Sequence, residues 1–127
     1  MEIYEQFAKW LDNLLENNDM PDETAAYNFN IYDEEDETYG VQLIAAGEFS
    51  EDDDDWACEE VWSSEEDIFY IDHSDEEDAD SARGLEYISG LVTDYLASGN
   101  YARILLASKA VGCGFIDGDI ELLYREK

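Results

Sequence analysis

Carboxylates are the side chains of this sequence with the clearest chemical potential, because many of them gather in three short runs. The runs lie at residues 33–37 (DEEDE), 51–55 (EDDDD) and 75–80 (DEEDAD). Clustered carboxylates can hold a calcium ion, and a pair of them can serve as acid and base in glycoside hydrolysis. They can also form a surface that attracts a positively charged protein.

The calcium interpretation fails the spacing test of an EF-hand loop. Such a loop needs oxygen ligands at positions 1, 3 and 5, glycine at position 6 and glutamate at position 12. A loop begun at Asp33 has Thr38 at position 6, and a loop begun at Asp72 has Glu77 there. A different calcium site at residues 51–55 stays open, since carboxylate clusters bind divalent ions weakly. We predict no dedicated metal site and no cofactor.

The residues that most enzyme classes require are scarce. His73 is the only histidine, so a catalytic triad or a histidine-rich metal site has little to draw on. Cys58 and Cys113 are too few for a disulfide framework, and we expect both to be small buried residues. With 35 acidic residues, a pair at glycosidase spacing carries no information. The sequence therefore predicts a non-enzymatic protein.

The net charge limits the class of partner. The chain has 35 acidic and 6 basic residues, a net charge of -29, and no base between Lys9 and Arg83. Such a field repels nucleic acid and anionic membranes, and it attracts cationic proteins and speeds their association. We expect a basic protein partner, no direct contact with nucleic acid and no membrane contact. The alternative is a charged surface that serves only solubility.

Two tryptophans interrupt the acidic region. Trp56 follows the run 51–55 directly, and Trp62 lies six residues later, so in an extended element both would point to one side. Tryptophan is favoured at interface hot spots, where cations stack on it, but burial in the core is the alternative for both. The predicted partner-binding residues are Asp33, Glu34, Glu35, Asp36, Glu37, Asp52, Asp53, Asp54, Asp55, Trp56, Glu59, Glu60 and Trp62.

Hydrophobic spacing predicts the helices that would support this surface. Apolar residues three and four apart predict a helix from Ile3 to Leu15. A second helix is expected to begin at Asp80 or Ser81 and to end before Ser98. Residues 102–109 fit either a short helix or a strand, because so short an apolar run has no decisive period.

Alternating residues predict the strands. Segments 24–32 and 38–46 alternate apolar and polar side chains, and the short connection 33–37 makes them antiparallel neighbours. A short extended element at 56–62 and a third strand at 68–72 follow. Acidic connections at one end of such a sheet can combine into one patch.

The C-terminal region predicts a second hairpin. Asp117-Gly118 is a preferred two-residue turn, and it would pair Val111 with Tyr124 and Cys113 with Leu122. One face would then carry Val111, Cys113, Phe115, Ile120, Leu122 and Tyr124. Together these elements predict a single α+β domain over residues 1–127. Its antiparallel sheet would have about five strands, with both main helices on one face.

Three segments resemble the small acidic immunity proteins of bacterial toxin systems, including contact-dependent inhibition. They are IYDEEDETYGVQL, FSEDDDDWACEEVW and GFIDGDIELLY. The resemblance implies a cytoplasmic protein that neutralises a nuclease toxin by covering the toxin's cationic substrate-binding surface. It transfers no individual residue role, because immunity families differ in fold. The alternative function is a nucleic-acid mimic that sequesters DNA-binding proteins, with carboxylates arranged at the spacing of phosphates.

Overall fold

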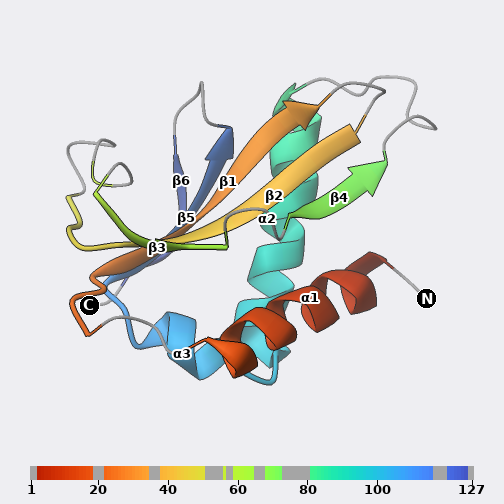
Figure 1. Ribbon diagram of the computed structural model, residues 1–127. Coiled ribbons are helices and arrows are strands. Elements are labelled where there is room, and N and C mark those ends of the chain that lie inside the picture. The colour runs from red at the N-terminus through yellow and green to blue at the C-terminus, as the bar shows by residue number, and fades with distance from the viewer. Residues whose placement is uncertain are drawn as a thin grey trace.

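A computed structural model of the protein describes residues 3–18, 22–34, 38–50, 56, 59–64, 68–72, 81–115 and 120–125. The elements in chain order are α1 (Ile3–Asn17), β1 (Ala26–Glu34), β2 (Thr38–Ala46), β3 (Glu60–Ser63), β4 (Phe69–Asp72), α2 (Ser81–Ser98), α3 (Ala102–Leu106), β5 (Ala110–Phe115) and β6 (Glu121–Arg125). The strands form one mixed sheet, and the helices pack against one of its faces (Figure 1). This architecture confirms the predicted α+β class with two long helices on one face.

The sheet is built around the β1–β2 hairpin. The strand order is β3-β2-β1-β5-β6, and β4 also pairs with β2. β1 and β2 are antiparallel from Ala26 opposite Ala46 to Glu34 opposite Thr38, as the alternation predicts. β3 and β4 pair with different parts of β2, so they share its outer edge end to end. This edge and the β6 edge are the two lateral limits of the described sheet.

The central pair β1–β5 is parallel, so the prediction of a wholly antiparallel sheet was wrong at this position. The helices α2 and α3 carry the chain back beneath one face to the end of the sheet where β1 begins. There the Lys109 amide donates a hydrogen bond to the Ala25 carbonyl at 2.7 Å. Because β5 starts beside the start of β1, the two strands run in the same direction.

The main core fills the space between the helices and the sheet. Its buried members are Phe7, Leu11, Leu14, Leu15, Tyr27, Phe29, Ile31, Tyr39, Val41, Leu43, Ala45, Phe69, Ile88, Leu91, Val92, Tyr95, Ala102, Leu105, Val111 and Cys113. Phe7 of α1 connects the layers, since its ring lies 5.5 Å from the Phe69 ring of β4 and 6.4 Å from the Tyr95 ring of α2. Burial of these side chains is the main source of stability.

The segment 102–109, which the sequence left open, is a short helix followed by a turn into β5. The Ser108 hydroxyl contacts the carbonyls of Leu105 at 2.6 Å and Ala110 at 3.0 Å, which closes the helix end. None of the helices within the described ranges has the length and apolar character needed to cross a membrane.

The C-terminal hairpin has a register irregularity that the sequence did not reveal. Val111 pairs with Tyr124 as predicted, but the next pair is Gly112 with Leu122. One step along β5 therefore corresponds to two steps along β6, and Leu123 is the extra residue of a β-bulge. The predicted pairing of Cys113 with Leu122 was wrong for this reason. The Asp117-Gly118 turn lies outside the described residues.

The bulge also changes which residues of β6 face the helices. Leu123 and Tyr124 both pack against the main core, whereas Leu122 is 37% exposed. Ile120 packs against a separate cluster on the other face of the sheet. The prediction that Ile120 and Leu122 share the helix face was therefore wrong, because a bulge reverses the alternation of the strand beyond it.

Candidate functional site

Trp56 is part of the interior, so its assignment as a surface anchor was wrong. It is 3% exposed and lies in a second apolar cluster on the sheet face opposite the helices, which we call the outer face. Its buried neighbours there are Ala26, Ile44, Ala46 and Ala110, and its ring packs edge-on against Phe49 at 5.3 Å.

Small residues of the sheet explain the burial of this tryptophan. A Cβ added at Gly112 would lie 3.4 Å from a ring carbon of Trp56, so the indole packs closely against this glycine. Ala26, Ala46, Ala110 and Gly112 lie on neighbouring strands, and these small residues leave a shallow apolar surface. One large apolar side chain can cover this surface. The small residues at 26, 46, 110 and 112 lie on three strands, so the sequence shows this cluster only once the strand pairings are known.

Trp62 lies on the opposite side of the sheet from Trp56. It belongs to β3, pairs with Ala45 of β2 and packs, half-buried, against the main core on the helix face. The expectation that the two tryptophans point to one side was therefore wrong. They contribute to two separate apolar clusters and cannot form one joint anchor.

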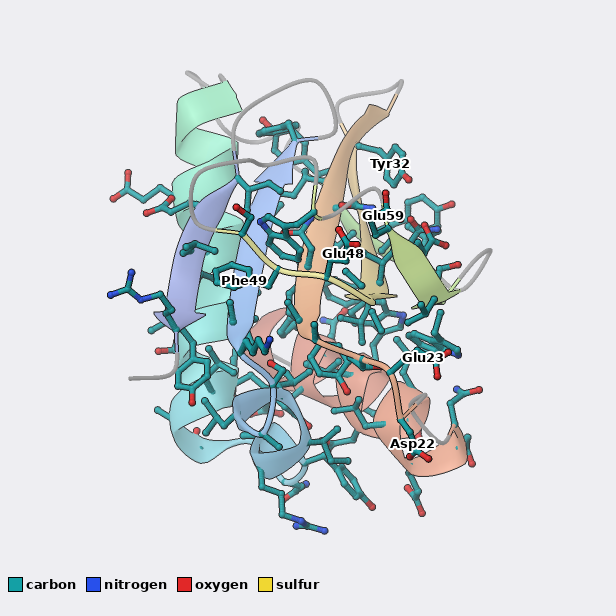
Figure 2. All side chains as sticks on the ribbon, turned by 90° about the vertical axis from the view of Figure 1, so that its left-hand side faces the viewer. Asp22, Glu23, Tyr32, Glu48, Phe49 and Glu59 are labelled. Atoms are coloured by element: carbon teal, nitrogen blue, oxygen red, sulfur yellow. The ribbon has the colours of Figure 1, made fainter. Side chains whose placement is uncertain are left out.

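Five exposed acidic residues of the described chain lie instead at the open end of the β1–β2 hairpin. Asp22, Glu23, Glu48, Glu59 and Glu60 are all exposed there, and we call these five residues the acidic corner. Figure 2 shows Glu48 and Glu59 near the middle of this side of the molecule, with Glu23 and Asp22 below them.

Backbone contacts bring the three segments of the acidic corner together. The Ala25 amide donates to the Ala46 carbonyl at 2.7 Å, and the Gly47 amide donates to the Glu59 carbonyl at 2.8 Å. A Cβ at Gly47 would lie 3.8 Å from the Glu59 carbonyl oxygen and 3.9 Å from that of Glu23. The corner is thus fixed by main-chain hydrogen bonds at the margin of a sheet, while its carboxylates remain in solvent.

Glu59 and Glu60 are the predicted site residues that belong to the acidic corner. Asp33 and Glu34 are the last residues of β1, at the other end of the hairpin. The nine residues of β2 separate the two ends by about 26 Å at the usual rise per residue. Asp33 and Glu34 therefore lie far from Glu59 and Glu60 along the sheet, while the acidic connections expected to combine into one patch fall almost entirely outside the described residues. Glu35, Asp36, Glu37, Asp52, Asp53, Asp54 and Asp55 lie outside the described residues.

Sequence reasoning missed Asp22, Glu23 and Glu48, although a signal was present. Once residue 26 is placed opposite residue 46, residues just before β1 must meet residues just after β2. The hairpin register alone would have brought Glu23 and Glu48 to one end of the sheet. All three residues lie outside the three acidic runs of the sequence.

The corner has no evident metal chemistry. In the part of the chain that the structure describes, no group of three or more His, Cys, Asp or Glu side chains could hold a metal ion. Exposed carboxylates without such convergence are suited to long-range attraction and to pairing with lysine or arginine.

Comparison with known proteins finds no matching family model, no matching curated protein and no matching solved structure. The function must therefore be inferred from the residues of this chain.

Proposed function

We propose that this protein is a non-enzymatic inhibitor of the immunity-protein kind, which binds and neutralises a cationic protein partner. The observation that carries the proposal is the acidic corner, where five exposed carboxylate residues gather in a molecule of net charge -29. Self-repulsion on this scale disfavours the compact state, and the lysine and arginine residues of a partner relieve it. The partner we propose is a nuclease toxin, because a phosphate-binding surface is rich in such residues.

The mechanism is competition for the partner's substrate site. Carboxylates occupy positions where the phosphates of nucleic acid would bind, and the field of the whole molecule raises the association rate. Trp56 has no part in the contact, because it is buried between the sheet and Phe49. The acidic corner supplies charge and Val61, which is 37% exposed on β3 beside it, supplies apolar contact area.

A pull-down tests the proposal with two variants that lose equal charge. In the corner variant, Glu23, Glu48, Glu59 and Glu60 are replaced by Gln. In the helix variant, which is the control, four exposed acids of α1 and α2 are neutralised: Glu5→Gln, Glu16→Gln, Glu86→Gln and Asp94→Asn. The full-length protein is used as bait in a lysate of its source, at low and at moderate salt.

We expect one dominant basic partner that the wild type and the helix variant retain and the corner variant loses. A set of unrelated DNA-binding proteins on the wild type would favour the nucleic-acid mimic instead. Retention of no basic protein at either salt concentration would overturn the proposal. With the purified partner, the association rate should fall steeply as salt rises, because the steering charges are exposed.

A further inference from the structure

The connection between β2 and β3 carries two residues of the acidic corner, Glu48 near its start and Glu59 at its end. It runs from residue 47 to residue 59 and is longer than most connections in compact domains, which have about 4–6 residues. Both carboxylate side chains are exposed, and their like charges repel each other. Contacts elsewhere in the connection must therefore hold these two residues at the end of the sheet.

The aromatic side chains of the connection lie against the outer face. Trp56 is 3% exposed and Phe49 is partly buried, and their ring centroids are 5.3 Å apart. The Trp56 ring also reaches Gly112 of β5, where an added Cβ would lie 3.4 Å from a ring carbon. Figure 2 shows Phe49, Glu48 and Glu59 on the same side of the molecule. A connection that leaves β2 is thus held by contacts that extend across the sheet to β5.

Main-chain hydrogen bonds link Trp56 to the acidic corner. The Trp56 carbonyl accepts the Glu59 amide at 3.1 Å, and the Glu59 carbonyl accepts the Gly47 amide at 2.8 Å. Gly47 directly precedes Glu48 in the chain. Two backbone hydrogen bonds therefore connect the residue with the buried indole to both ends of the connection, where the two exposed carboxylates lie.

We propose that Trp56 is a positioning residue, which holds Glu59 beside Glu48 and so fixes the arrangement of the acidic corner before the partner arrives. The inference rests on the proposed function, since it takes the acidic corner as the binding surface. A segment that is already fixed loses less conformational entropy on binding. Burial of the indole also opposes the repulsion among the carboxylates. Trp56 thus contributes to affinity without touching the partner.

A role in overall stability alone makes a different prediction. Loss of a side chain that only stabilises the whole fold speeds hydrogen exchange at the amides that open by global unfolding. Loss of a local contact speeds exchange only in the segment that the contact holds. Hydrogen exchange of individual amides, followed by NMR on the free protein, therefore separates the two roles without the partner.

Four variants provide the comparison. Trp56→Ala removes the indole, and Trp56→Phe keeps an aromatic ring in the cluster. Phe49→Ala removes the ring that packs on Trp56, and this milder variant carries the test where Trp56→Ala does not fold. Trp62→Ala is the matched control, because Trp62 belongs to the adjacent strand β3 but packs against the main core on the helix face.

We expect exchange at the Gly47 and Glu59 amides to become more than about tenfold faster in Trp56→Ala. Phe49→Ala should speed the same two amides less, and Trp56→Phe should restore most of their protection. The Ser64 amide, which donates to the Leu43 carbonyl at 2.9 Å, should exchange as in the wild type. Unchanged exchange at Gly47 and Glu59, or an equal rise at Ser64 or in Trp62→Ala, would overturn the positioning role and leave the proposed function standing.

Binding kinetics connect this role to the proposed function. With the basic protein that the pull-down isolates, Trp56→Ala should dissociate about tenfold faster than the wild type. Its association rate should stay within about twofold, because the net charge is still -29. An unchanged dissociation rate despite faster exchange would overturn the contribution of Trp56 to binding. A wild type that retains no basic protein would overturn the proposed function, whereas the exchange rates would still decide whether Trp56 holds the corner.

Discussion

Two glycines show how strongly the effect of a residue depends on its neighbours. A Cβ at Gly112 would lie 2.6 Å from Ile120 Cγ2 and 2.8 Å from Asn28 Oδ1, whereas a Cβ at Gly90 of α2 meets nothing within 4 Å. We expect Gly112→Ala to destabilise the protein by about 1–3 kcal/mol through overpacking. We expect Gly90→Ala to stabilise it by about 1 kcal/mol through higher helix propensity. Urea unfolding measures both, and a shift of the same sign in the two variants would contradict the packing described around Gly112.

Buried ionisable groups predict a loss of stability at alkaline pH. Burial raises the pKa of the Cys113 thiol from 9.0 to about 12, with Ser89 lowering it and Glu121 raising it to smaller extents. Burial also raises the pKa of Tyr27 from 10.0 to about 12. Both groups hold their protons more tightly in the folded state, so their stabilisation is complete below pH 9 and is lost as pH rises towards 12.

The urea midpoint should therefore fall between pH 9 and pH 12, and the fall should be shallower in Tyr27→Phe, which cannot ionise at this position. The same slope in Tyr27→Phe and wild type would show that this tyrosine does not contribute.

At the scale of elements, Tyr95 connects α1 to the turn between α2 and α3. Its hydroxyl donates to Asp12 Oδ1 at 2.6 Å and accepts the Tyr101 amide at 3.2 Å, while Asn100 Nδ2 donates to Asp12 Oδ2 at 2.9 Å. Tyr95→Phe removes the first two bonds and leaves a partly buried carboxylate with fewer donors. We expect a loss of about 1–3 kcal/mol of unfolding free energy. Tyr70→Phe on β4, where the side chain is 59% exposed, is the control and should change stability little. An equal loss in both variants would show that the hydrogen bonds of Tyr95 do not stabilise the protein.

The elements with local signals were predictable from the sequence, and the pairings between distant segments were not. The β1–β2 hairpin and both long helices follow from apolar spacing within about twenty residues of chain. The β1–β5 pairing joins residue 26 to residue 110, and no periodicity within either strand says whether such neighbours are parallel. The bulge at Leu123 was invisible for a related reason: β6 reads as a regular strand, and only packing against the main core reveals the extra residue.

The candidate site shows the same difference between features with a local signal and features made by distant segments. Charge and exposure could be predicted for Glu59 and Glu60, because acidic residues at the margin of a strand seldom enter a core. The role of Trp56 could not, since its environment is made by alanines and glycines from three distant strands. The acidic corner depends on strand register, which brings separate segments to one place. A surface assembled in this way appears in a sequence only after the fold is known.

At the scale of the whole molecule, one excess of charge acts on folding and on binding in opposite directions. A net charge of -29 makes the compact state repel itself, and it also attracts a basic partner. Salt screens both effects, since the Debye length falls from about 30 Å at 0.01 M to about 3 Å at 1 M. Raising NaCl should therefore increase the urea midpoint of the free protein and decrease its affinity for the partner.

The corner and helix variants separate these two consequences. Each removes four negative charges, so both should raise stability at low salt and reduce its dependence on salt by similar amounts. Only the corner variant should lose affinity for the partner, because the helix acids belong to α1 and α2 and not to the acidic corner. Urea unfolding and partner binding, each measured at about 0.02 M and about 0.5 M NaCl, provide the four comparisons. Equal affinity losses in the two variants would mean that attraction depends on total charge alone, and the acidic corner would then have no role beyond its share of that charge.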